Sequence, residues 1–419
     1  MPRKAQGGLF AWCLYDWANS AFPTVITTFV FAAYFTKAVA VDEIGGTADW
    51  GYAISLSGLA VAVLSPFLGA VADHGGRRKP WIAAFTVLCV VATAALWLAE
   101  PNPGFVLLAL VLVGSANFAF EMAMVFYNAM LPDLVAKDHI GRLSGWGWGL
   151  GYAGGLACLA LALLALVEAE TPVFGLNKDA AEHLRATGPL AALWMAVFAV
   201  PLFLWTPDRP SKGLAFAVAL KKGGATLVDT LKRVGDYKDI ARYLIAHMIY
   251  ADGLVTLFAF GGIYAAGTFG MDFSELIVFG IAINVTAGLG AAAFAWIDDW
   301  IGPKRTIQIS VIALTVLGAA LVLAEGKIMF WALALPLGIF VGPAQAASRS
   351  LLAHLAPAAV RTEMFGLFAL SGKATAFAGP ALLAWATVAF DSQRAGMATI
   401  LVFFIGGLVL LAGVPDKRN

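Results

Sequence analysis

Twelve long apolar stretches dominate this 419-residue sequence. A membrane-spanning helix needs about 20 mostly apolar residues, and the stretches lie near that length. Lipid cannot hydrogen-bond to a backbone, so each stretch must satisfy its own N–H and C=O groups as a helix. The sequence therefore predicts an all-α membrane protein with twelve transmembrane helices, at 9–37, 50–72, 81–99, 105–131, 143–167, 190–205, 240–269, 273–297, 306–324, 329–352, 364–390 and 397–414.

The composition supports this interpretation and excludes several classes of function. Charged residues make up only 13% of the chain and hydrophobic residues 61%, whereas a soluble domain carries about 25% charged residues. A net charge of +1 gives no reason to expect a nucleic-acid partner. The cysteines and histidines show no metal-ligand spacing. We therefore expect no metal, no cofactor and no enzymatic activity.

Lys and Arg predict the orientation of the spans. The first stretch is too long for the apolar region of a signal peptide, which is about 7–15 residues, so we take it as the first span. With the N-terminus in the cytoplasm, 21 of the 27 basic residues fall on the cytoplasmic side, as the positive-inside rule requires. Lys373 lies within a span, and the basic residues left outside are Lys37, Lys178, Arg185, Lys327 and Arg394. Both termini are therefore predicted to be cytoplasmic.

The two halves of the chain resemble each other. DHGGRR at 73–78 follows the second span and DWIGPK at 299–304 follows the eighth, and LSG occurs at 143–145 and again, at nearly the same offset, at 370–372. Parallel six-helix repeats are a transporter architecture. We expect six-helix bundles at 1–206 and 240–419, joined by a basic cytoplasmic linker at 207–239 that could form an interfacial helix.

One motif resembles the loop signature of the major facilitator superfamily. It reads Gly69-x-x-x-Asp73-x-x-Gly76-Arg77-Arg78-Lys79, and its second copy is degraded, with Ala295 in place of the first glycine. The resemblance implies a cytoplasmic gate in which Asp73 caps the N-terminus of span eleven and stabilises the outward-open state. The residues that we assign to this gate are Gly69, Asp73, Gly76, Arg77, Arg78, Arg142, Asp299 and Arg349.

Further segments narrow the resemblance to the vacuole-effluxer-like branch, related to the autophagy-linked vacuolar amino-acid exporter of fungi. They include YDWANSAF at 15–22, FYNAMLPD at 126–133, GWGWGLGY at 145–152 and FGLFALSGK at 365–373. The resemblance covers nearly the whole chain and implies the two-bundle fold. Span four carries Asn117 and Glu121 where many superfamily members have an arginine, so a proton-antiport mechanism does not follow from the motifs.

Four charged residues lie well inside predicted spans: Asp16, Glu121, Asp252 and Lys373. Each costs about 2.5–3.5 kcal/mol at a helix centre, so exposure to lipid is unfavourable. All four lie about 10–18 Å from the predicted cytoplasmic ends, at the depth of a transporter site. Polar residues at helical spacing accompany them, and the predicted substrate or proton site comprises Asp16, Asn19, Asn117, Glu121, Asn128, Asp252 and Lys373.

These charges suggest how transport is driven. We expect Lys373 to pair with Asp252 or Asp16, and a buried carboxylate left without a partner tends to take up a proton. The leading hypothesis is a proton-coupled secondary transporter that moves a small, amino-acid-like solute by alternating access. The alternatives are transport of an amphipathic substrate such as a lysolipid, or a non-transporting membrane receptor. The expected partners are a small-molecule substrate, protons and membrane lipids, and the protein is expected to be a monomer in a bacterial inner membrane.

Overall fold

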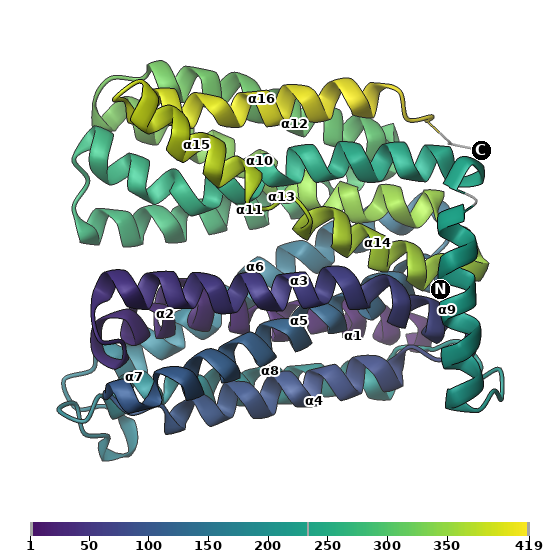
Figure 1. Ribbon diagram of the computed structural model, residues 1–419, viewed down its shortest axis with the longest axis horizontal. Helices are drawn as coiled ribbons and strands as arrows, with labels where there is room; N and C mark the ends of the chain where they lie inside the picture. The colour runs from purple at the N-terminus through teal and green to yellow at the C-terminus, as the bar shows by residue number, and fades with distance from the viewer. Residues whose placement is uncertain (1–2, 233, 417–419) are drawn as a thin grey trace. The chain divides into compact units, whose positions relative to one another are not determined.

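A computed structural model describes residues 3–232 and 234–416, and almost all of them are helical (Figure 1). Arg233, Lys417 and Arg418, which contribute to the predicted cytoplasmic charge, lie outside the described residues. Twelve helical segments are long and apolar enough to cross a membrane, which confirms the predicted fold class. They are Gln6–Val39, Glu43–Gly75, Lys79–Leu98, Pro103–Leu134, Lys137–Val167, Glu182–Trp205, Gly235–Phe269, Glu275–Ile301, Pro303–Leu323, Gly326–Leu355, Ala358–Ala389 and Gln393–Ala412.

Contacts between residues divide the chain into two compact units. The first unit comprises Met1–Leu64, Gly76–Met130 and Leu150–Gly213, and the second comprises Ser65–Gly75, Leu131–Gly149 and Leu214–Asn419. Short pieces of spans two, four and five therefore pack with the second half of the sequence. The division at 1–206, 207–239 and 240–419 rests on the sequence repeats and stays a prediction.

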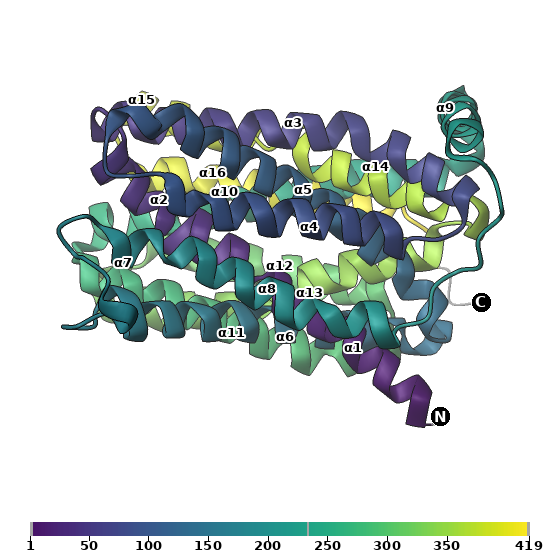
Figure 2. The same cartoon turned by 90° about the horizontal axis from the view of Figure 1, so that it is seen from below.

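Within the described residues, the first unit is built from six main helices and the irregular continuation of the first. They are α1 (Arg3–Asn19), α3 (Glu43–Gly75) up to Leu64, α4 (Lys79–Ala95), α5 (Val106–Leu134) up to Met130, α6 (Ile140–Ala162) from Leu150, and α8 (Thr187–Trp205). Figure 2 shows α8 between α1 and α4, both of which it contacts. The core of this unit is apolar, with Phe22, Phe31 and Phe35 fully buried.

The first span is not a regular helix. After α1 it continues as a π-helical segment (Phe22–Phe29), a short α2 (Phe31–Tyr34) and a second π-helical segment (Phe35–Val39). The first π segment has Pro23 as its second residue, and the amide of Val30 donates to the carbonyl of Val25, five residues back. A π turn holds more residues than an α turn. The polar residues at helical spacing that accompany Asp16 therefore keep that spacing only as far as Ser20.

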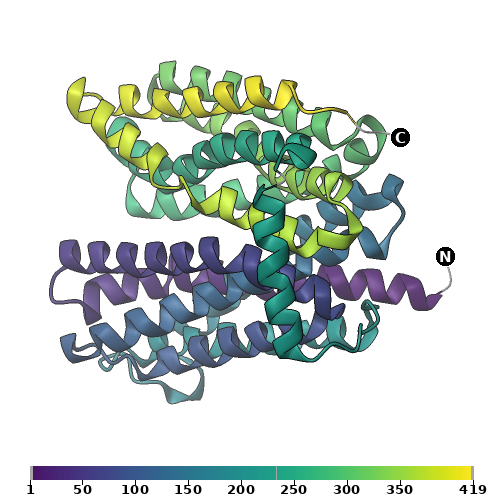
Figure 3. The ribbon, with the colours of Figure 1, turned by 45° about the vertical axis from the view of Figure 1, so that its right-hand side comes forward.

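The second unit contains the remaining spans and a surface helix. Its helices are α9 (Phe216–Lys232), α10 (Lys238–Phe269), α11 (Phe273–Ile301), α12 (Pro303–Leu323), α13 (Gly326–Leu355), α14 (Arg361–Lys373), α15 (Ala378–Ala389) and α16 (Gln393–Ala412). α13 runs unbroken through Pro336 and Pro343. Span eleven, by contrast, is broken between α14 and α15. Figures 1 and 3 show α9 running crosswise over the ends of α3 and α14.

Glycines on two faces of α6 allow close helix packing. A Cβ on Gly145 would lie 2.6 Å from the Cβ of Ala295 in α11, within the second unit. A Cβ on Gly154 would lie 2.7 Å from the Cα of Trp17 in α1, within the first unit. Backbone atoms cannot yield as a flexible side chain can. The glycines of this stretch therefore allow α6 to pack closely against α11 and α1.

We predict that Gly154→Ala lowers stability by about 1–3 kcal/mol, because the added methyl group overlaps the backbone of Trp17. Gly262→Ala is the matched control. It lies inside α10 with nothing within 4 Å of the added Cβ, and it should raise stability by up to about 1 kcal/mol. Thermal unfolding of the purified variants followed by size-exclusion chromatography measures both. Equal midpoints for the two variants would contradict the packing argument.

Candidate functional site

Asp73 caps the first turn of α14. Its carboxylate accepts hydrogen bonds from the backbone N–H of Thr362 at 2.7 Å and of Glu363 at 3.0 Å, and from the Thr362 hydroxyl at 2.7 Å. The residue before α14, Val360, offers no side-chain cap of its own. The free N–H groups of a helix start attract negative charge. The contact expected between Asp73 and span eleven is therefore present, and it lies within the second unit.

Small residues let α3 approach α14 closely enough for this cap. A Cβ on Gly69 would lie 2.6 Å from the carbonyl oxygen of Thr362. One turn earlier in α3, the Ser65 hydroxyl donates to the carbonyl of Gly366 at 3.0 Å. A side chain at Gly69 or Gly366 would separate the two helices and lengthen the hydrogen bonds of Asp73.

Asp299 makes the corresponding contact with α6. The backbone N–H of Arg142 donates to Oδ1 of Asp299 at 3.0 Å, and the Arg142 Nε lies 3.2 Å from Oδ2. Arg142 is in the first turn of α6, as Glu363 is in the first turn of α14. The two copies of the sequence repeat thus supply two carboxylates that perform the same task at two helix starts.

Arg349 joins α13 to α6 at the same level. It is 2% exposed, and its guanidinium donates from Nε to the Ser144 hydroxyl at 2.9 Å and from Nη2 to the Ser144 carbonyl at 2.7 Å. The Ser144 hydroxyl donates in turn to the carbonyl of Ala346 at 2.7 Å. Arg349 therefore holds two helices together through hydrogen bonds to uncharged groups.

The last part of the loop motif lies in the first unit and serves another helix. Gly76 has a φ of +91°, which favours glycine. The N–H groups of Arg78 and Lys79 donate to the carboxylate of Asp208 at 3.1–3.2 Å, so Asp208 caps α4. The Arg77 side chain is exposed. The eight predicted gate residues are thus divided, with Gly76, Arg77 and Arg78 apart from the other five.

Two buried carboxyl groups accompany the two caps, and the sequence analysis did not assign them a role. Glu363 is 0% exposed and Asp298 is 3% exposed. Each has a hydroxyl as a hydrogen-bond partner, Thr230 for Glu363 and Ser350 for Asp298. Glu363 directly follows the capped Thr362, and Asp298 directly precedes the capping Asp299. In the sequence, the only hint of a role for Asp298 was that it directly neighbours Asp299, which begins the second copy of the repeat.

An ion pair between Asp133 and Arg361 supports the start of α14. Oδ1 of Asp133 and Nη1 of Arg361 lie 2.5 Å apart. Asp133 ends the segment 126–133 used for the family resemblance, but the pairing could not be read from the sequence, because it joins residues more than two hundred positions apart.

Five residues of the predicted substrate or proton site belong to the first unit. The Tyr127 hydroxyl lies 2.8 Å from Oδ2 of Asp16 and 2.9 Å from the carbonyl of Trp12, and the rings of Trp12 and Tyr127 stack at 4.3 Å. Asn19 donates to the sulfur of Met124 at 3.1 Å. Asp16 is therefore held by a neutral hydroxyl that the sequence analysis did not single out.

The other polar residues of this group lie farther along the same helices. Asn117 of α5 donates to the Ser57 hydroxyl of α3 at 2.7 Å. Glu121 and Asn128, also on α5, are half-buried. The polar spacing predicted along span four therefore lies on one continuous helix, α5.

Asp252 and Lys373 belong to the second unit. Oδ2 of Asp252 accepts from the backbone N–H of Gly379 at 3.1 Å, and Oδ1 has no hydrogen-bond partner within the described part of the chain. Asp252 is therefore bonded to the start of α15, which the break in span eleven presents to it. Lys373 does not take this position, and its expected pairing with the alternative partner, Asp16, stays a prediction.

Similarity to known proteins agrees with this architecture. The family described as vacuole effluxer Atg22 like matches residues 39–419. The MFS-type transporter YxiO of Bacillus subtilis is 28% identical, over 98% of this chain and 95% of that protein. Autophagy-related protein 22 of Coccidioides immitis is 23% identical, over 88% of this chain and 72% of that protein.

Solved structures show the same fold. The proton:xylose symporter XylE aligns with a TM-score of 0.74 at 14% identity, covering 99% of this chain and 96% of that chain. The human organic anion transporter MFSD10 aligns with a TM-score of 0.71 at 13% identity, covering 98% of this chain and all of that one. With twelve spans, a repeated carboxylate cap and these relatives, the chain belongs to the vacuole effluxer Atg22-like family and is a multi-pass membrane transporter of the major facilitator type.

Proposed function

We propose that this transporter is a proton-coupled secondary transporter that exports a small, amino-acid-like solute by alternating access. The observation that carries the proposal is the set of ionisable side chains that lie inside the spans, namely Asp16, Glu121, Asp252 and Lys373. Tyr127 holds Asp16, and a backbone N–H holds Asp252. Ionisable groups at membrane depth are costly and mark substrate or proton pathways.

A hydroxyl partner suits a carboxyl group that changes its protonation state. A tyrosine hydroxyl can donate to an ionised carboxylate and can accept from a protonated one. Asp16 can therefore keep its Tyr127 partner in both states, as a proton carrier requires.

The charged residues inside the spans suggest the proposed class of solute, an amino-acid-like molecule. Asp16, Glu121 and Asp252 can meet an ammonium group, and Lys373 can meet a carboxylate. Export is supported by the family description, a vacuole effluxer. In this proposal the protein acts as a monomer in a bacterial inner membrane, with both termini in the cytoplasm.

The two carboxylate caps serve as the cytoplasmic gate in this proposal. Asp73 and Asp299 attach α3 and α11 to the first turns of α14 and α6. Such contacts are strong only at short range and with good geometry, so a small sliding of either helix releases them. The gate residues then close the cytoplasmic side, and the charged residues inside the spans bind the solute.

The proton-carrier role predicts that Asp16→Asn and Glu121→Gln alter the dependence of transport on a pH gradient. In proteoliposomes, at least one variant should transport at a rate that no longer responds to the gradient, because an amide cannot release a proton. Asp179→Asn, at an exposed position between spans five and six, is the control and should behave as the wild type. An unchanged response in both test variants would remove the role.

The gate predicts opposite results for two neighbouring carboxyl groups. Asp73→Asn should lower stability by about 1–3 kcal/mol, because charge-assisted hydrogen bonds to buried N–H groups are lost. Glu363→Gln replaces a buried carboxyl whose partner is the Thr230 hydroxyl. The amide can keep a contact with that hydroxyl and carries no charge, so the stability of this variant should stay equal or rise. Thermal unfolding compares them, and solute counterflow shows whether Asp73→Asn also slows exchange. A larger loss from Glu363→Gln would contradict this assignment.

The solute class is tested by ligand stabilisation. A ligand at 100 times its Kd stabilises the folded protein by about 2.7 kcal/mol. We expect members of an amino-acid panel to raise the unfolding temperature of the wild type, with the increase reduced in Asp16→Asn. Stabilisation by lysolipids alone would favour the amphipathic substrate, and flux into liposomes then separates a transporter from a receptor.

A further inference from the structure

α15 begins in contact with α10 and then separates from it. At its start, Gly379 donates to Asp252, and a Cβ on Gly379 would lie 3.0 Å from Oδ1 of that residue. Toward its other end a pocket of about 240 Å³ opens between α10, α15 and α16. All residues that line it belong to the second unit.

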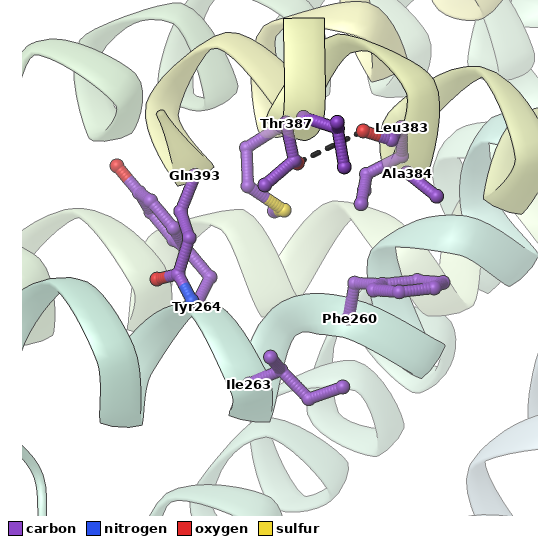
Figure 4. A pocket seen from close by; sticks show the side chains of 9 residues that line it. Phe260, Ile263, Tyr264, Leu383, Ala384, Thr387 and Gln393 are labelled. Atoms are coloured by element: carbon purple, nitrogen blue, oxygen red, sulfur yellow. Dashed lines mark hydrogen bonds between the residues drawn. The ribbon is translucent and has the colours of Figure 1, made fainter. Parts of the chain in front are cut away.

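The pocket is apolar at depth and polar at one end. Phe260, Leu383 and Ala384 line the deeper part, and Tyr264 and Gln393 lie closer to the ends of their spans. Figure 4 shows Gln393 beside Tyr264 on one side and Phe260 and Ala384 on the other. The polar end of the pocket therefore lies toward the membrane surface, where a lipid has its headgroup. The apolar end lies deeper, where a lipid has its acyl chains.

Side chains next to the pocket are apolar and exposed. Ile263 is 56% exposed, Trp385 62% and Val388 82%. All three lie within segments that are long and apolar enough to cross a membrane, so we take lipid to be the medium that covers them. Water is a poor occupant of such a pocket, because apolar walls offer it too few hydrogen bonds.

We propose that this pocket binds one acyl chain of a bilayer phospholipid. The chain packs against Phe260 and Leu383, and the polar part of the lipid lies near Gln393. In the region where α15 has separated from α10, a bound chain fills the space between them and so holds α15 in place. The proposal depends on the membrane spans and not on the transported solute.

The test uses phosphatidylglycerol with a photoactivatable diazirine in its acyl chain, incorporated into liposomes with the full-length protein. Mass spectrometry of the labelled peptides should show residues 260–264 and 383–388 labelled above the exposed apolar segment 107–111. Ala384→Trp, which fills the pocket, should lose most of this labelling. Ala381→Trp, at an exposed position of α15 outside the lining, should keep it.

Three outcomes would overturn the proposal. The first is equal labelling in the two tryptophan variants, and the second is labelling of 260–264 that is no stronger than that of 107–111. The third is protein-dependent movement of the labelled lipid across the bilayer, which would make the lipid a substrate. If Ala384→Trp does not fold, Ala384→Leu takes its place. As a second measurement, phosphatidylglycerol added to delipidated protein should raise the unfolding temperature of the wild type more than that of the filled variant.

Discussion

The structure depends on carboxylates from one helix that satisfy the N-terminus of another. A helix that starts away from water leaves N–H groups without partners, and α14 has no side-chain cap in its own sequence. Asp73 supplies what α14 lacks. This one interaction also explains why Gly69 and Gly366 carry no side chain, because the capping distance requires the two backbones to touch.

Two buried carboxyl groups lie beside the caps. Glu363 follows the capped Thr362 and Asp298 precedes the capping Asp299, and the hydroxyls of Thr230 and Ser350 are their hydrogen-bond partners. Removing an ionised carboxyl from water is costly. These neighbours therefore offset part of the stability that the two caps supply.

Helix α6 contributes to the packing of each unit. Its early glycines pack on α11 in the second unit, and its later glycines pack on α1 in the first unit, where a Cβ on Gly151 would lie 3.5 Å from the Cβ of Asp16. The break in span eleven separates two contacts of the second unit, because α14 is bonded to Asp73 and α15 is bonded to Asp252.

The sequence by itself determined the twelve spans, the repeat and the partner helix of Asp73, because hydrophobic length and a local motif are properties of short segments. It did not determine the π-helical turns of span one, the break in span eleven or the partners of Asp16, Asp133 and Asp252. Those depend on which face each helix turns toward its neighbours, and the packing of side chains distant in sequence sets that rotation. Only the tertiary structure therefore decided that Asp252 binds Gly379 in place of Lys373 and that α15 leaves a pocket beside α10.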